Sequence, residues 1–323
     1  MIAQYAVTLF IILVLNFFLP RMMPGDPFLL MSGETEGEVV SILTEEQRLY
    51  YISYYGLDRP IHEQFIGYAM SLLTGDFGMS IYYKVPVLDA IWTHLPWTVL
   101  IVLGATVLST AAGVFLGVFS ARRREKAADR LMIIGLISFA EIPSFLLGLI
   151  LLLTFAVYWK IFPLAGAITP FARYAGPADQ VWDITYHAFL PMITLALTQL
   201  TGVYLLTRNT LVTVMTKDYI RTARAKGIGD RLVWYRHALR NALLPVVTRV
   251  GFQLGMLVGG AVLVENVYNY PGIGTLLRNA VIARDYPLIQ GIMLVMAVSI
   301  LSANYLVDVL YKRLDPRTAP SEV

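Results

Sequence analysis

The clearest functional pattern is a short basic segment that runs from Lys217 to Gly227. We expect Asp218 to cap a helix there, because a carboxylate accepts hydrogen bonds from the free N–H groups of a first turn. Gly227 suits the left-handed position that follows a helix end. The helix between them has about two turns, which is too short to be stable in isolation. It therefore needs a partner surface.

The side chains of this predicted helix favour binding over catalysis. Tyr219 and Ile220 are expected as apolar anchors, and Ala223 and Ala225 permit close approach. Such a pattern is typical of a helix that docks in a groove of another protein. The alternative is a basic helix on the membrane surface that only fixes orientation, and pattern alone does not decide between the two. The candidate docking residues are Asp218, Tyr219, Ile220, Arg221, Thr222, Ala223, Arg224, Ala225, Lys226 and Gly227.

Motifs for catalysis and for cofactors are missing from the sequence. It contains no Gly-x4-Gly-Lys-Ser/Thr phosphate loop, no His-Glu-x-x-His and no Gly-x-Ser-x-Gly. The absence of cysteine excludes disulfides, cysteine-ligated zinc and iron–sulfur clusters, and the 4 histidines lack metal-ligand spacing. We expect no catalytic residue, no metal and no cofactor, so an enzyme is the weaker interpretation.

Composition places much of the chain in lipid. Hydrophobic residues make up 57% of the 323 residues and charged residues only 15%, against about 25% charged in soluble domains. Lipid leaves backbone groups unsatisfied unless they are helical, and strand-like alternation is absent, so we expect an all-α polytopic membrane protein. Long stretches almost free of charge predict six transmembrane helices, at 1–20, 96–121, 131–159, 187–214, 242–265 and 288–311.

Basic residues predict the orientation of these spans. Most of the 25 lysines and arginines lie in three segments on one side, which the positive-inside rule makes cytoplasmic: 122–130, 215–241 and 312–323. Both termini should then face the cytoplasm, although Arg21 directly after the first span favours the reverse. The extracytoplasmic segments are 21–95, which should include a helix near 61–73, then 160–186 and 266–287, the last expected as a hairpin loop.

Polar residues within the spans are candidates for a translocation pathway. Glu141 is the one acidic residue deep in a predicted span, and burial of a charge costs at least about 2.5 kcal/mol on insertion scales. It can attract a cationic group of a solute, or the span begins later and leaves it near the interface. Gln199, Gln253 and Asn304 are further candidates, with interhelical hydrogen bonding as the alternative role.

Several short motifs follow one another in order along nearly the whole chain. The basic segment is followed by RHALRNALLP at 236–245, and the others are PGDP at 24–27, GLDRP at 56–60, GDFG at 75–78, PSF at 143–145, YPGIG at 270–274, ARDYP at 283–287 and DPR at 315–317. Together they resemble the permeases of ATP-binding-cassette (ABC) importers, in the dipeptide/oligopeptide/nickel branch of binding-protein-dependent transport systems. Two residues depart from the general importer signature, because Arg221 and Thr222 replace a Glu and an Ala.

The resemblance implies a role for the basic segment and a set of partners. The segment would be the coupling helix, which docks on a separate ATPase subunit. The partners would be a second homologous permease, two ABC ATPases, an extracytoplasmic solute-binding protein and the lipid bilayer, with no nucleic acid. Small residues in the fifth span would pack against the second permease: Gly251, Gly255 and Gly259. The same spacing in the second span is expected to serve packing within the chain: Ser109, Gly113 and Gly117.

These observations predict a multi-pass permease of the bacterial inner membrane that forms half of a peptide pathway. It would work by alternating access, driven by ATP hydrolysis in partner subunits. An importer of nickel, a metallophore or an oligosaccharide has the same architecture and remains open. An ion-coupled transporter that works alone would need clustered intramembrane charges and inverted repeats, neither of which is evident.

Overall fold

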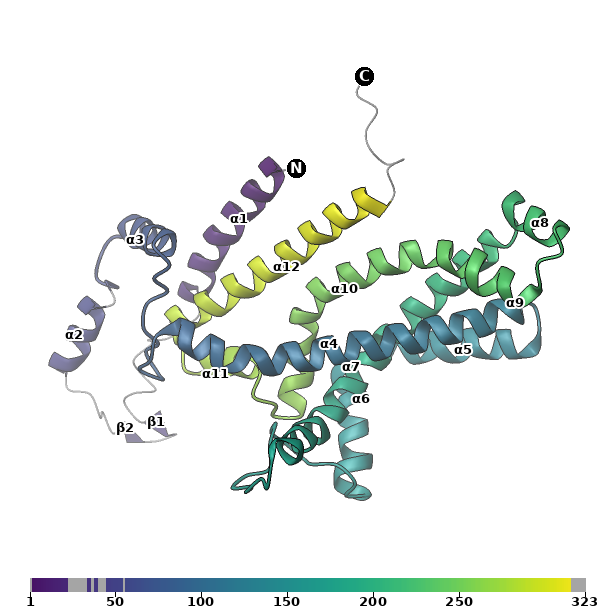
Figure 1. The fold of residues 1–323 in the computed structure, drawn as a ribbon. Helices are drawn as coiled ribbons and strands as arrows, with labels where there is room; N and C mark the ends of the chain where they lie inside the picture. The colour runs from purple at the N-terminus through teal and green to yellow at the C-terminus, as the bar shows by residue number, and fades with distance from the viewer. Residues whose placement is uncertain (1, 23–33, 36–37, 40–44, 55, 315–323) are drawn as a thin grey trace. The chain divides into compact units, whose positions relative to one another are not determined.

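The computed structural model is almost entirely helical, and it describes residues 2–22, 34–35, 38–39, 45–54 and 56–314. Only the backbone is described at 2–4, 6, 34–35, 38–39, 45, 48, 51, 252–260, 306–308 and 310–314. Figure 1 shows the elements in order: α1 (Ile2–Arg21), β1 (Glu34–Thr35), β2 (Glu38–Val39), α2 (Glu45–Tyr54), α3 (Ile61–Leu73), α4 (Val87–Arg122), α5 (Ala127–Ala140), α6 (Ser144–Leu151), η2 (Leu152–Tyr158), α7 (Pro177–Val214), α8 (Asp218–Ala225), α9 (Asp230–Leu232), η3 (Val233–Ala238), α10 (Leu239–Val267), α11 (Ile273–Ile282) and α12 (Tyr286–Leu314). The two short strands pair antiparallel.

The chain divides into two compact units, one of Met1–Pro96 with Gly272–Val298 and one of Trp97–Pro271 with Ser299–Val323. In the first unit, Asp285 is fully buried and fixes the start of α12. Its carboxylate accepts hydrogen bonds from the N–H of Leu288 at 3.2 Å and from the N–H of Tyr82 at 3.0 Å. The apolar core of this unit joins α4, α11 and α12 through Val87, Ile91, Ile273, Leu276, Leu288 and Ile292.

In the second unit, α4 packs closely on α7 through small residues. A Cβ added at Gly113 would lie 2.7 Å from the Cβ of Val203, and one added at Gly117 would lie 2.7 Å from the Cβ of Thr207. No side chain fits in either space, so the two backbones approach each other as small residues permit in membrane helices. The expected packing within the chain is confirmed for this stripe.

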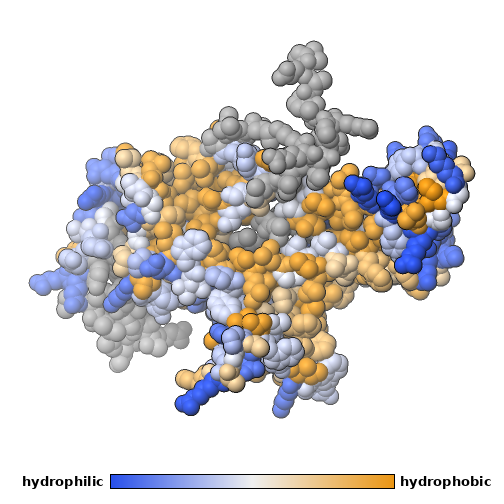
Figure 2. All heavy atoms as spheres, viewed as in Figure 1, coloured by the Kyte–Doolittle hydropathy of each residue, from blue (hydrophilic) through white to orange (hydrophobic). Residues whose placement is uncertain are grey.

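Three helices among the described residues are long and apolar enough to cross a bilayer, namely α4, α7 and the Tyr286–Tyr305 part of α12. Their exposed faces hold large apolar side chains, such as Val107 and Phe115 of α4, which are 67% and 70% exposed. Figure 2 shows apolar residues over much of the surface that these helices form. Soluble proteins rarely expose such continuous apolar surface. Six spans and the orientation of the termini remain predictions.

The helix predicted over 131–159 is instead two helices that meet at an angle of 99°. α5 ends at Ala140 and α6 begins at Ser144, so Glu141, Ile142 and Pro143 form the break. Pro143 explains it, because proline has no N–H to donate and disfavours helical backbone at the residue before it. With this bent pair counted as one span, the candidate spans number four in the described part of the chain.

Other element boundaries differ less from expectation. α3 matches the helix predicted near 61–73. The predicted hairpin over 266–287 contains a helix, α11, which the turn residues Pro271 and Gly272 precede. Five of its ten residues are buried, so this segment is part of a packed unit and more than a simple loop.

Candidate functional site: a short helix at the end of the long helices

The basic segment forms α8, which lies where α7 ends and α10 begins (Figure 1). Ile220 is fully buried and Ala223 is 6% exposed. Both belong to an apolar cluster of the second unit with Val118, Ala121, Leu211, Val214, Val233, Ala238 and Ala242. The cluster therefore joins α8 to the ends of α4, α7 and α10.

This packing corrects the expected role of two residues. Ile220 was predicted to anchor the helix in a partner and Ala223 to allow a partner close, yet both face the chain's own core. They lie three residues apart and so share one face of the helix. The face of α8 that stays exposed is the opposite one.

The ends of α8 are close to those predicted from sequence. Lys217 occupies the N-cap position with extended backbone, and Asp218 is the first helical residue, so the predicted cap is wrong by one position. Asp218 still lies in the first turn, where an acidic group interacts favourably with the helix dipole. Gly227 has φ +74°, and its N–H donates to the carbonyl of Arg224 at 2.9 Å. The N–H of Ile228 donates to the carbonyl of Ala223 at 3.3 Å, which completes a Schellman ending.

The outer face of α8 is exposed and mostly polar. It consists of Asp218, Arg221, Thr222 and Ala225, which have the i, i+3, i+4, i+7 spacing of one helix face. Arg221 Nη1 lies 3.5 Å from Asp218 Oδ1, but both side chains are at least 75% exposed, so this pair adds little stability. We call these four residues the outer face.

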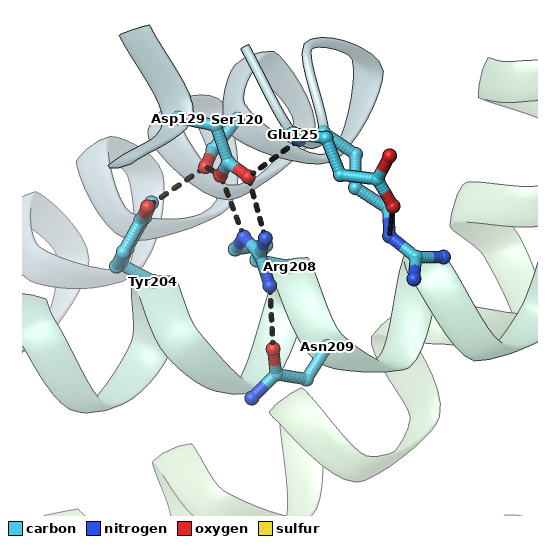
Figure 3. A network of polar contacts seen from close by, with 7 residues as sticks. Ser120, Glu125, Asp129, Tyr204, Arg208 and Asn209 are labelled. Atoms are coloured by element: carbon cyan, nitrogen blue, oxygen red, sulfur yellow. Dashed lines mark hydrogen bonds and ion pairs between the residues drawn. The ribbon is translucent and has the colours of Figure 1, made fainter. Parts of the chain in front are cut away.

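A buried ion pair fixes the helices beside α8 (Figure 3). Asp129 of α5 is 2% exposed and accepts two hydrogen bonds from Arg208 of α7, from Nε to Oδ1 at 2.7 Å and from Nη2 to Oδ2 at 2.6 Å. Ser120 Oγ at the end of α4 donates to the same carboxylate, and the hydroxyl of Tyr204 donates to Ser120 Oγ at 2.8 Å. The backbone N–H of Glu125 adds a further bond at 3.2 Å. A paired charge with this many donors is the form in which proteins tolerate buried carboxylates.

Comparison with known proteins decides the family. Residues 113–320 match the family model described as "Binding-protein-dependent transport system inner membrane component". The chain is also 36% identical over 310 residues to the glutathione transport system permease protein GsiC of Escherichia coli strain K12 and to that of Shigella dysenteriae serotype 1 (strain Sd197). Each of these matches covers 96% of this chain and 94% of the relative. The chain belongs to this family. It is thus an inner-membrane permease subunit of an ABC transport system, as its motifs indicate.

The predicted pathway residues of the permease lie on separate elements. Glu141 is exposed in the break between α5 and α6. Gln199 of α7 is 8% exposed and accepts a hydrogen bond from Ser109 Oγ of α4 at 3.4 Å, so it lies in a helix–helix contact. Asn304 of α12 is half-buried. The side chain of Gln253 lies outside the described residues.

The stripe predicted to pair with a second permease is only partly described. Gly251 is half-buried in α10, whereas Gly255 and Gly259 belong to the stretch whose side chains lie outside the described residues. Their role therefore stays a prediction.

Sequence patterns did not single out Asp129 of the permease. It lies in a segment with five basic residues, where an acid is typical of solvated surface. Its partner Arg208 did give a sequence signal for a buried ion pair. Arg208 interrupts an apolar stretch of the fourth span, and a cation there requires a buried acceptor.

Proposed function

We propose that this permease forms half of a pathway for short peptides and that α8 is its coupling helix, gripped by a separate ATPase subunit. The observation that supports this most strongly is the division of α8 into two faces. Ile220 and Ala223 bind it to its own chain, while the outer face stays open to solvent. A helix that is held on one side and free on the other can take up force from a partner and pass it on.

The connection from α8 to the spans is short and stiff. Three residues separate α8 from α7, and Ile220 packs with Leu211 of α7 and Val118 of α4 in one cluster. On the other side, the amide of Asn241 in α10 donates to the hydroxyl of Tyr219 at 3.0 Å. Displacement of α8 by a partner would therefore move the ends of three long helices together.

The names of the relatives support a peptide as the solute. They are named for glutathione, which is a tripeptide, and the motifs of this chain resemble those of the peptide branch. We propose a short peptide as the solute, delivered by an extracytoplasmic binding protein, with a second permease completing the pathway. Uptake of labelled glutathione and labelled dipeptides, in competition with nickel, separates this proposal from a metal importer.

Charge reversal on the outer face tests the coupling role. We expect Arg221→Glu with Ala225→Glu to abolish peptide uptake and peptide-stimulated ATP hydrolysis, because the acidic side chains would enter the contact, while the amount of inserted permease is unchanged. The matched control is Arg173→Glu, an exposed residue of the loop predicted to lie on the opposite side. Normal uptake by the α8 variant would refute the coupling assignment.

The predicted orientation is open to a direct test, since the chain contains no cysteine. Ala225→Cys should resist a membrane-impermeant maleimide in intact spheroplasts and react after lysis. Ala172→Cys, exposed on the loop before α7, should react in both. The reverse labelling pattern would place α8 outside the cytoplasm and exclude an ATPase as its partner.

A further inference from the structure

A groove of about 660 Å³ lies in the second unit between the last turns of α4 and the segment where η3 leads into α10. Its wall is apolar and includes Val114, Phe115 and Phe119. Its rim is basic and consists of Arg122, Arg123 and Lys126. We call these two parts the wall and the rim.

The three side chains of the rim are exposed, and its two arginines lie over aromatic rings. The guanidinium of Arg123 lies 3.9 Å from the centroid of the Phe119 ring, and that of Arg122 lies 5.9 Å from the centroid of the Tyr235 ring. Cation–π contacts of this kind hold a cation in place without neutralising it. Asp230 Oδ2 lies 3.8 Å from Arg122 Nη2. This one carboxylate pairs with one of the three cations, so the rim keeps a net positive charge.

The wall faces outward and is continuous with the membrane-spanning part of α4. Phe115 is 70% exposed, although it lies within a helix apolar enough to cross a bilayer. Figure 2 shows hydrophilic residues gathered at the α8 end of this unit and apolar residues along the helices that lead to it. The groove therefore extends from the apolar zone to the basic zone.

We propose that this groove binds an anionic phospholipid of the cytoplasmic leaflet, with its phosphate at the rim and its acyl chains along the wall. Basic pockets at the cytoplasmic ends of membrane helices complement such headgroups, and the wall supplies the matching apolar surface. A seam with another membrane helix would instead favour small residues, which allow close approach, and the wall has two phenylalanines. The proposal rests on the orientation proposed above, and otherwise it is independent of the solute and of the coupling role.

The test compares two double variants that remove the same charge from the same basic segment, 122–130. The assembled transporter, purified with its partner subunits, is placed in nanodiscs of phosphatidylcholine with phosphatidylglycerol, and the phosphatidylglycerol retained after delipidation is measured by native mass spectrometry. We expect Arg123→Gln with Lys126→Gln to weaken retention by about five-fold for each cation removed. Arg124→Gln with Arg130→Gln changes exposed cations outside the groove, so we expect little effect.

Two further arms separate a lipid from a soluble anion. Phe115→Ser should lower retention of phosphatidylglycerol, because it removes apolar contact with the acyl chains. Glycerol 3-phosphate, which has the phosphate but no chains, should not displace the lipid at equal concentration. Displacement by this probe would overturn the proposal in favour of a soluble anion site.

The remaining outcomes are also decisive. Equal losses in the two double variants would mean that only diffuse charge attracts the lipid, and the groove would not be a site. Loss of the ATPase or of a second permease from the purified complex, with lipid retention unchanged, would show that the groove is a protein interface. Either result refutes the lipid proposal, and neither bears on the assignment of the outer face.

Discussion

Replacement of Asp129 by asparagine is the sharpest test of the packing beside α8. The change keeps the shape of the side chain but leaves the guanidinium of Arg208 without a counter-charge, and an amide offers one acceptor where the carboxylate offered two. Breaking a buried pair in this way costs about 3–5 kcal/mol. The side chain of Arg208 is 16% exposed and can recover some hydration. We therefore expect a loss near the lower limit, about 3 kcal/mol.

The assay is the free energy of unfolding of the permease, measured by denaturant titration in mixed micelles. Asp230→Asn is the matched control, because Asp230 also lies near two arginines, Arg122 at 3.8 Å and Arg224 at 3.9 Å, but its side chain is 62% exposed. Exposed pairs contribute about 0–1 kcal/mol, so this variant should unfold almost like the parent chain.

A double variant separates the charge from the packing. Asp129→Leu with Arg208→Met removes both charges and replaces them with apolar side chains, which is often neutral or stabilising for a buried pair. We expect its stability to lie within about 1 kcal/mol of the parent chain. If Asp129→Asn costs no more than Asp230→Asn, the pair is not buried in the membrane-embedded protein, and the network in Figure 3 does not fix these helices.

Three further predictions concern the same region, each measured by the free energy of unfolding in mixed micelles. Ile220→Ala should cost about 2–5 kcal/mol, because the side chain is fully buried and its loss leaves a cavity; a cost below about 1 kcal/mol would mean that α8 is not seated on its own chain. Gly117→Ala should lower the free energy of unfolding by about 1–3 kcal/mol, because the new Cβ clashes with Thr207. Gly135→Ala should raise it by about 0.5–1 kcal/mol, because no atom lies within 4 Å of the new Cβ. A change of the same sign in both variants would contradict the close packing of α4 on α7. Gly227→Ala should cost about 1–2 kcal/mol, because φ is +74°, and should speed tryptic cleavage after α8; unchanged cleavage would argue against the left-handed ending.

Local patterns predicted α8 well and its surroundings poorly. The acid in the first turn and the glycine after the last turn locate the helix to within one residue, because helix ends depend on nearby groups. The eight residues of α8 do not reveal which face packs on its own chain, because Ile220 suits a partner's groove and an internal core equally. The contact that decides it includes Val118 and Ala121 of α4, which lie far away in sequence.

The same distinction applies to the long helices. The stripe of Gly113 and Gly117 predicted close packing correctly, because small residues leave few other options in lipid. The break at Glu141 was hidden by the apolar composition of 131–159, although Pro143 was a local signal for it. The pair of Asp129 and Arg208 joins residues 79 positions apart, so no short-range pattern contains it.

The break between α5 and α6 has a consequence for what must surround it. α5 has 14 residues and α6 with η2 has 15, so each piece is about 21–23 Å long, less than the hydrocarbon thickness of about 30 Å. Neither piece reaches across alone, and the irregular backbone around Glu141 then falls at a depth where fatty tails offer no hydrogen bonds. Such backbone persists only where other protein or trapped water covers it. The elbow between α5 and α6 must therefore be covered by other protein, whether helices of this chain or a partner subunit, or by trapped water.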